Sequence, residues 1–439
     1  MMPISIDLSK YNKLLSEARP IRRQGKVCQV VGLTIEVQGI SGLLGELCYI
    51  NTRLNTILPA EIVGFREGRA LLMPLGEMQG IQAGSPVMAS GRLMTVPVGP
   101  QLLGRVLDGL GRPLDSNGPL QTGERYPITN DAPHPLRRIP ISQPMPTGVR
   151  AIDGMLTCGA GQRIGIFAGS GVGKSTLIGM IARNSRSDVS VIGLIGERGR
   201  EVQEFIDRDL GPEGIRRSVV VVSTSDEPPL IRLKGALVAT AIAEYFRDQG
   251  LNVTFLMDSV TRFAMAQREV GLAIGEPPAT KGYTPSVFAA LPKLMERAGT
   301  SEKGTITGFY TVLVEGDDFT EPVTDTARSV LDGHIVLSRE LAAESHYPPI
   351  DVSNSISRLM SSIASEEHRR AAAAVREAIA VYNRARDLID IGAYAPGSNA
   401  DIDRALVLMP KIRAFLQQPP SEATPFEETV SRLTAIVGD

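Results

Sequence analysis

The chain has 439 residues, of which 43% are hydrophobic and 21% charged, as expected for a globular protein of two or three domains. Its formal net charge is −2, Trp is absent and aromatic residues make up 5%, so the sequence offers neither a basic field nor many stacking platforms for nucleic acid. We therefore expect no nucleic-acid partner.

The first segment, residues 1–24, has an amphipathic helical pattern over residues 6–18, with basic residues on or just after it. Two interpretations are open: a terminal helix that rests on the next domain, or one that docks a partner. The segment lacks the uninterrupted apolar run of a signal peptide, and the chain contains no apolar run of about 18 residues. Three scattered cysteines without CxxC spacing agree with a reducing compartment, so we expect a cytoplasmic protein.

Residues 25–93 contain short β-rich runs separated by Gly-containing turns at close intervals. This pattern predicts a small antiparallel barrel or sandwich. Residues 94–149 are rich in Pro and Gly, which suit neither helix nor strand interiors. We interpret this second stretch as an ordered connector that lies over the following domain.

From residue 151 the pattern alternates between strand and helix. Strands are predicted at 163–168, 189–194, 218–222, 253–257, 306–314 and 335–337, and helices at 174–182, 198–208, 229–249 and 260–272. This alternation predicts an α/β core with a parallel sheet covered on both faces, which with the connector spans residues 94–360. Beyond it the strands end, and residues 361–439 are predicted to form a helical C-terminal domain.

The sequence AGSGVGKS at 168–175 joins the first predicted strand to the first helix and fits a phosphate-binding loop, except that Ala168 replaces the usual first Gly. Glycines let successive backbone N–H groups converge on phosphate oxygens, and the helix N-terminus adds its positive dipole end. Lys174 would reach the β- and γ-phosphates, and the Ser175 hydroxyl would ligate Mg²⁺. The competing interpretation is a glycine-rich turn that happens to carry Lys-Ser. The predicted nucleotide-binding residues of the loop are Gly169, Ser170, Gly171, Val172, Gly173, Lys174, Ser175 and Thr176.

Two carboxylates follow other predicted strands of the core. Asp258 ends the strand VTFLMD and is predicted to hold Mg²⁺, while Glu197 ends VIGLIGE and is our candidate for polarising the attacking water. Ligands bind at the carboxyl edge of a parallel sheet, where both would lie. Glu197 could instead form a salt bridge with Arg198 or Arg200. Arg198 is a further catalytic candidate, which would touch phosphate or position Glu197.

Several longer motifs resemble the F1/V1-type rotary ATPase superfamily. They are GERGREVQEFI (196–206), MDSVTRFAMAQREVGLAIGEPPATKGY (257–283), EGDDFTEP (315–322) and PPIDVSNSIS (348–357). Within it, TCGAGQRIGIFAGSGVGKS, LDGHIVLSR (331–339) and IGAYAPGSNADIDRAL (391–406) are most similar to the type III export ATPases, in particular the flagellar ones. The resemblance extends from about residue 25 to residue 418.

The resemblance implies an N-terminal β-barrel, a RecA-like P-loop core and a helical C-terminal domain. It further implies that Tyr347 packs on the adenine of ATP and that Arg358 is an arginine finger that meets the γ-phosphate on a neighbouring subunit. From the residues alone, an aromatic before Pro is more often a core or turn residue, and Arg358 could be a solvated arginine. The second face of the adenine pocket is not evident in the sequence, because Phe415 is followed by Leu-Gln-Gln-Pro-Pro.

In function, the resemblance implies a Mg²⁺-dependent ATPase that assists type III protein export, most closely in flagellar assembly. The implied partners are five further copies in a homohexamer, a stator-like regulator at the N-terminus, a stalk-like protein in the ring centre, export chaperones and substrates, and a membrane export gate at the inner face of the cytoplasmic membrane. The alternatives are a virulence injectisome ATPase, a rotary synthase catalytic subunit, a termination-factor-like RNA translocase and a nucleotide-sensing scaffold. The near-neutral charge and few aromatics of residues 25–93 argue against RNA.

Overall fold

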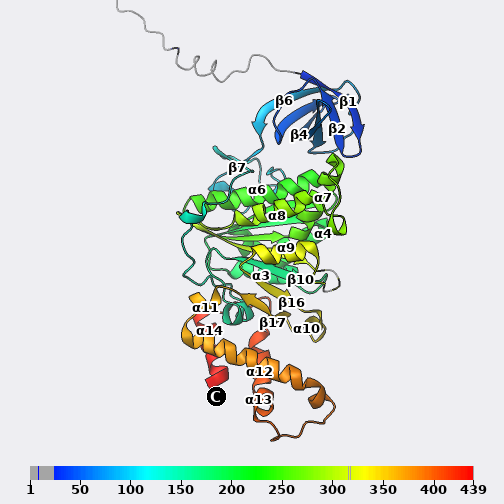
Figure 1. Cartoon of the computed structure of the whole chain (residues 1–439). Coiled ribbons are helices and arrows are strands. Elements are labelled where there is room, and N and C mark those ends of the chain that lie inside the picture. Colours follow the sequence, from blue (N-terminus) through cyan, green and yellow to red (C-terminus); the bar gives the residue numbers. More distant parts are fainter. Residues whose placement is uncertain (1–7, 9–23, 315, 317, 439) are drawn as a thin grey trace, which may run out of the picture. The chain divides into compact units, whose positions relative to one another are not determined.

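The structure is a computed structural model that describes residues 8, 24–314, 316 and 318–438 (Figure 1). The chain divides into two compact units, Met1–Met94 and Thr95–Asp439. The amphipathic pattern at 6–18 falls outside the described residues except for Leu8, so its docking role stays a prediction.

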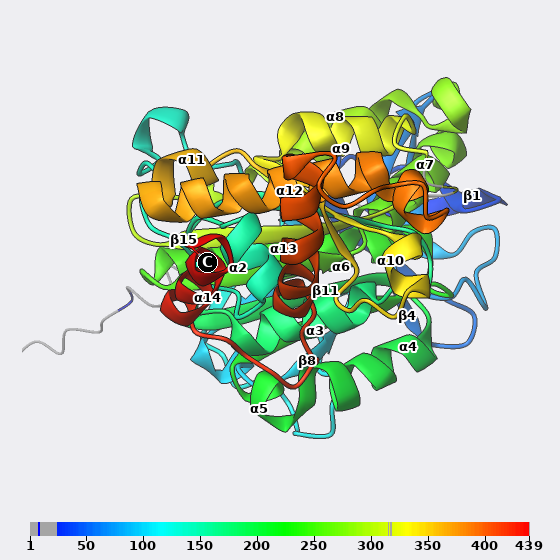
Figure 2. The same cartoon turned by 90° about the horizontal axis from the view of Figure 1, so that it is seen from below.

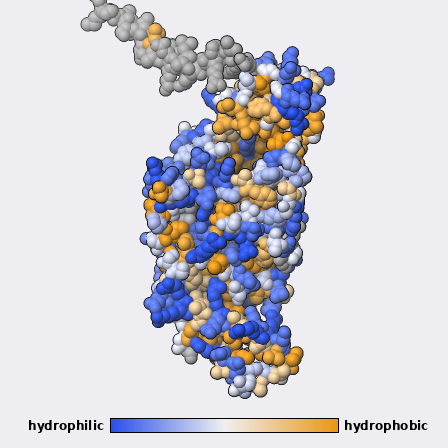
Figure 3. All heavy atoms as spheres, viewed as in Figure 1, coloured by the Kyte–Doolittle hydropathy of each residue, from blue (hydrophilic) through white to orange (hydrophobic). Residues whose placement is uncertain are grey.

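The first unit is a closed antiparallel barrel of six strands in the order β1-β2-β5-β4-β3-β6. The strands are β1 (Gln24–Val31), β2 (Thr34–Gln38), β3 (Glu46–Asn51), β4 (Ile57–Arg66), β5 (Arg69–Pro74) and β6 (Pro86–Leu93). Alternate side chains such as Cys48 and Ile50 of β3 are fully buried inside, because successive strand residues point to opposite faces. The barrel prediction is therefore confirmed over the sandwich. Several large apolar side chains remain exposed on it, among them Leu43 and Leu44, and Figure 3 shows apolar residues gathered on its visible face.

The second unit is built on a nine-stranded sheet with the order β17-β16-β10-β15-β13-β11-β12-β8, in which β14 pairs with β15. The strands are β8 (Val106–Asp108), β10 (Arg163–Ala168), β11 (Val189–Glu197), β12 (Ser218–Thr224), β13 (Asn252–Asp258), β14 (Gly299–Thr300), β15 (Thr305–Leu313), β16 (Gly333–Leu337) and β17 (Ile350–Ser357). All neighbours from β16 to β8 are parallel, whereas β14 and β17 pair antiparallel. The predicted parallel sheet is confirmed.

Helices cover both faces of this sheet (Figure 1). They are α2 (Arg150–Met155), α3 (Lys174–Asn184), α4 (Gly199–Glu204), a π-helical stretch η3 (Phe205–Leu210), α5 (Gly211–Arg216), α6 (Pro229–Asp248), α7 (Val260–Ile274), α8 (Pro285–Glu296), α9 (Pro322–Val330) and α10 (Arg339–Ala343). Successive side chains of β11 point to opposite faces of the sheet and so pack against different helices. Ile192 and Leu194 share a core with α3, while a Cβ on Gly193 would lie 3.2 Å from Ala239 of α6.

The connector contains more regular structure than we predicted. It holds β7 (Thr95–Val98), which pairs with β9 (Glu124–Pro127), the short helices η1 (Pro100–Leu102) and η2 (Pro135–Arg137), and β8 at the edge of the large sheet. A Pro- and Gly-rich chain accommodates β8 because this strand is only three residues long and pairs through one side with β12. A further short helix, η4 (Thr280–Gly282), precedes α8.

The C-terminal residues form α11 (Met360–Ile363), α12 (Glu366–Asp390), α13 (Ala400–Leu416) and α14 (Phe426–Gly438), and α12 runs lengthwise across the view in Figure 2. The Ser365 hydroxyl caps α12 by accepting the His368 N–H, and the Arg150 side chain of α2 donates to the Phe415 carbonyl at 2.9 Å. The helices therefore pack on the core as part of the second unit. Within the described ranges, no helix is long and apolar enough to cross a membrane.

Candidate active site

Three predicted residues meet at the carboxyl edge of the large sheet. Lys174 opens α3 after β10, Asp258 ends β13 and Glu197 ends β11. The Lys174 ammonium donates to Glu197 Oε1 at 3.2 Å and to Asp258 Oδ1, and the Thr311 hydroxyl of β15 also donates to Asp258 Oδ1, at 2.7 Å. The cluster forms because β10, β15, β13 and β11 are neighbours that end at the same edge.

The predicted phosphate loop connects β10 to α3. Gly171 and Gly173 have φ angles of 76° and 95°, a left-handed conformation that side chains with a Cβ rarely adopt. Val172 is buried, while Ser170 and Ser175 are exposed. Thr176, by contrast, hydrogen-bonds the Asp209 carboxylate through its side chain. The glycine conformations thus let the backbone N–H groups of the loop converge in front of the N-terminus of α3.

Burial and charge both act on this cluster. Burial raises the pKa of Asp258, the Lys174 ammonium opposes that change, and the charge of Glu197 adds to it. Burial also disfavours the charged form of Lys174, but the two carboxylates outweigh it, so the pKa of Lys174 is raised. Lys174 is therefore a buried ammonium held by two carboxylates, and the phosphates of a nucleotide would be an alternative anionic partner for it.

The residues predicted to hold Mg²⁺ are oxygen donors, which this hard cation prefers. Ser175 lies in the first turn of α3, and the Asp258 carboxylate pairs with the Lys174 ammonium. In the described part of the chain, no three His, Cys, Asp or Glu side chains form a dedicated cation cage. The donor set fits a cation that completes its shell with nucleotide oxygens and water.

Arg198 does not join the cluster. It is the residue before α4, its side chain is 78% exposed, and its guanidinium lies 3.3 Å from Glu201. Tyr347 does lie at the loop: a Cβ on Gly173 would be 3.8 Å from its Cε1, and the residue is 47% exposed. The ring is thus half-exposed beside the phosphate loop, and its packing on adenine stays a prediction.

Arg358 lies at the opposite edge of the sheet from the phosphate loop of its own chain. Ala168 pairs with Leu337 at the end of β16, whereas Ser357 pairs with Gly333 at its start. The four residue steps from Gly333 to Leu337 span about 13 Å at the rise of a strand. Arg358 is exposed, so its side chain can face another molecule.

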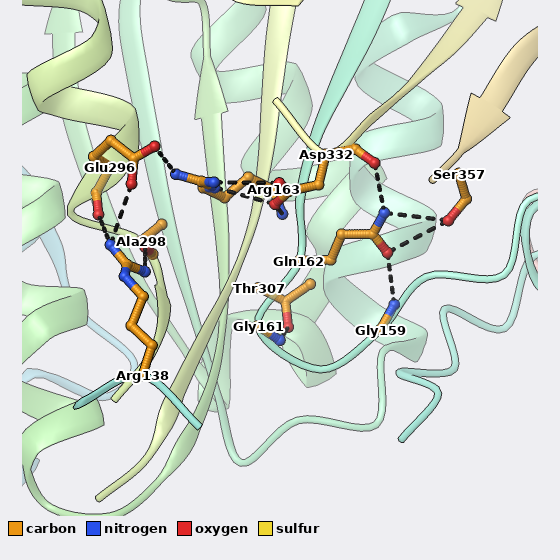
Figure 4. Close-up of polar contacts among 10 residues, drawn as sticks. All are labelled: Arg138, Gly159, Gly161, Gln162, Arg163, Glu296, Ala298, Thr307, Asp332 and Ser357. Carbon is orange, nitrogen blue, oxygen red and sulfur yellow. Dashed lines mark hydrogen bonds and ion pairs between the residues drawn. The ribbon is translucent and has the colours of Figure 1, made fainter. Parts of the chain in front are cut away.

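A polar network holds the backbone beside Arg358 (Figure 4). The Gln162 amide nitrogen donates to the Ser357 hydroxyl oxygen at 3.1 Å and to the Asp332 carbonyl at 3.0 Å. The Asp332 carboxylate in turn accepts from Arg163, which also pairs with Glu296. Arg358 therefore extends from a fixed base, although it is itself exposed.

Sequence reasoning missed Arg262. This residue of α7 lies against Gly196, where a Cβ would be 2.7 Å from the Arg262 Cβ, and among the described residues its buried Nε has no hydrogen-bond partner. Gly196 has a φ of 72° and directly precedes Glu197, so the Arg262 side chain packs against the residue next to Glu197. The signal was available in MDSVTR, where Arg262 lies in the first turn of the helix that follows the strand ending at Asp258.

Comparison with family models matches all three parts of the chain. Residues 27–91 match the beta-barrel domain and residues 148–357 the nucleotide-binding domain of the ATP synthase alpha/beta family. Residues 364–435 match the C-terminal domain of the type III secretion ATPase EscN.

Individual relatives match over almost the whole length. The chain is 54% identical to the flagellum-specific ATP synthase of Bacillus subtilis (95% of this chain, 96% of the relative) and 53% identical to the type 3 secretion system ATPase of Xanthomonas euvesicatoria (95% of each). The assembled ATPase EscN of enteropathogenic E. coli superposes with a TM-score of 0.90 at 46% identity, over 94% of this chain and 100% of that one. The predicted fold class and family are therefore confirmed: the chain belongs to the flagellar and type III secretion branch of the ATP synthase alpha/beta family and is an ATP-hydrolysing enzyme.

Proposed function

We propose that this protein is the cytoplasmic Mg²⁺-ATPase of a type III export apparatus, most closely that of the flagellum. The observation that carries the proposal is the Lys174–Glu197–Asp258 cluster under a phosphate loop. The relatives support the same activity, because flagellum-specific ATP synthases and type 3 secretion system ATPases match at about half of all positions. A virulence injectisome ATPase remains the second candidate, favoured by the match to EscN.

In this proposal, backbone N–H groups of the loop and the Lys174 ammonium bind the β- and γ-phosphates. Mg²⁺, held by the Ser175 hydroxyl and on the side of the Asp258 carboxylate, would neutralise charge on the phosphates. As Lys174 turns to phosphate, Glu197 loses its partner and can accept a proton from the attacking water. Arg262 would contact the developing charge from the side of Gly196.

We further propose a head-to-tail homohexamer in which each Arg358 completes the site of a neighbour. The support is geometric, since loop and finger lie at opposite edges of one sheet. A second structure of EscN, which superposes with a TM-score of 0.87, is of that ATPase in complex with its central stalk EscO, so a stalk-like partner in the ring centre is part of the proposal. So are a regulator at the N-terminus, export chaperones and substrates, and contact with a membrane export gate.

The enzymatic part is tested with Glu197→Gln, which keeps shape but lowers basicity. We expect kcat to fall about 10²–10⁴-fold with nearly unchanged ATP affinity, the usual effect of removing a general base. Glu204→Gln is the matched control, because Glu204 is a half-buried carboxylate that pairs with Arg200 of the same helix. A normal kcat in Glu197→Gln would assign Glu197 to structure.

The biological part is tested by complementation. The gene is expressed in a strain that lacks its flagellum-specific ATP synthase and in one that lacks its type 3 secretion system ATPase. Restored filament assembly in the first strain, without restored secretion in the second, supports the flagellar proposal. The reverse pattern supports the injectisome.

A further inference from the structure

The loop between the last two strands of the sheet lies beside the phosphate loop. β16 and β17 form a hairpin, and its connecting residues, 338–349, are called the hairpin loop here. The Ser338 N–H donates to the Pro349 carbonyl at 2.8 Å and closes the base of the hairpin loop. Because Leu337 pairs with Ala168 in the neighbouring parallel strand, the hairpin loop begins where the phosphate loop begins.

Arg339, the first residue of α10, makes close contact with Gly169. A Cβ built on Gly169 would lie 2.5 Å from Arg339 Nε, 2.6 Å from Nη2 and 2.9 Å from Cζ. The guanidinium therefore lies on the Cα of Gly169, in space that any other residue would fill. At Gly171 and Gly173 a positive φ angle favours glycine, but Gly169 has no positive φ. The contact with Arg339 is therefore the physical reason for a glycine at position 169.

The far end of the hairpin loop lies near the far end of the phosphate loop. A Cβ on Gly173 would be 3.8 Å from Tyr347 Cε1 and 4.0 Å from Pro349 Cδ. Of Arg339 and Tyr347, only Arg339 is close enough to restrict the phosphate loop, at its first glycine. The loop's backbone N–H groups bind phosphate only if they converge, so a side chain that fixes the first turn of the loop helps to fix the shape that binds.

We propose that Arg339 is a positioning residue whose guanidinium, lying on Gly169, holds the first turn of the phosphate loop in its nucleotide-binding shape. The inference deepens the proposed function and rests on it. The planar guanidinium suits this role, because it covers backbone with a flat face while its charge adds to the positive field that phosphates meet. Lysine supplies the charge without the flat face.

The inference is tested with a double-mutant cycle on the full-length protein. Arg339→Ala removes the guanidinium, and Gly169→Ala displaces it while keeping its charge, since the guanidinium is the mobile end of a long side chain. We expect each variant to raise the KM for ATP and the Kd for ADP on the order of 10-fold, the scale of one charge-assisted contact, with kcat within about 2-fold. The double variant should be no weaker than either single variant, because both remove the same contact.

Two further variants calibrate the result. Gly123→Ala is the matched control: this glycine is exposed, has no positive φ and has open space where the Cβ would be, so KM should not change. Arg339→Lys should recover only part of the affinity. If Arg339→Ala fails to fold, Gly169→Ala and Arg339→Lys still measure the contact.

The possible failures are distinct. A wild-type protein that neither binds nor hydrolyses ATP would remove the proposed function itself. An active wild type with an unchanged KM in Arg339→Ala would overturn only the inference about Arg339. Additive losses in the double variant, or a loss in kcat without a change in KM, would also overturn it, because the first denies the shared contact and the second indicates direct participation in chemistry.

Discussion

Removal of the ammonium from the buried cluster gives a prediction that can be worked from the structure. In Lys174→Met the stem is retained and the charge is lost, which leaves two carboxylates whose side chains are only 4% (Asp258) and 14% (Glu197) exposed. Breaking a buried ion pair costs about 3–5 kcal/mol, because the remaining charge stays desolvated. We expect a loss near the lower value at pH 8, about 3 kcal/mol, since a buried carboxyl can take up a proton.

The loss should depend on pH in a defined direction. Burial already raises the pKa of Asp258 with the ammonium present, and the pKa rises further without it. In the unfolded chain this carboxyl has its ordinary pKa of about 4. Because the folded variant then binds a proton that the unfolded variant does not, its stability relative to wild type should recover as the pH falls from 8 toward 5.

The assay is chemical denaturation of wild type, Lys174→Met and Lys174→Met/Asp258→Asn at pH 5, 6.5 and 8, without nucleotide. Asn cannot ionise, so the double variant should regain most of the lost stability at pH 8 and show little pH dependence of its own. The same deficit at every pH, or no rescue by Asp258→Asn, would refute the assignment of Lys174 as counterion of a buried carboxylate.

Other parts of the structure give three further predictions. Arg358→Ala should assemble but hydrolyse ATP on the order of 10³-fold more slowly, and mixing it with Lys174→Ala should restore part of the activity in mixed rings, as measured by phosphate release. Arg297→Met should lower the free energy of unfolding by about 3–5 kcal/mol in denaturant titrations. The substitution removes the guanidinium that donates to the two carboxylate oxygens of the fully buried Glu244, at 2.8 and 2.6 Å. Chelation of Mg²⁺ should abolish turnover while circular dichroism stays unchanged, and activity should return when Mg²⁺ is restored.

The positions of Lys174, Glu197 and Asp258 could be predicted because each ends or follows an apolar strand, and parallel strands bring their carboxyl ends to one edge of the sheet. Contacts between strands that are distant in sequence could not be predicted in this way. Arg339 reaches Gly169 only because β16 is inserted beside β10, a neighbour relation that periodicity does not encode. The exposure of Arg198 could not be predicted either, because a residue next to a catalytic candidate can face either way where a strand ends and a helix begins.

The separation of Arg358 from the phosphate loop of its own chain determines how one defective subunit affects the rest. If finger and loop serve different sites, every subunit takes part in two sites, one on each side. An open chain of subunits then always has one fewer complete site than it has members, so activity begins with the first dimer and ring closure adds only the last site. A subunit that lacks both groups would inactivate the two sites on either side of it. In mixed rings, the ATPase activity should therefore fall by more than the fraction of such subunits in the mixture.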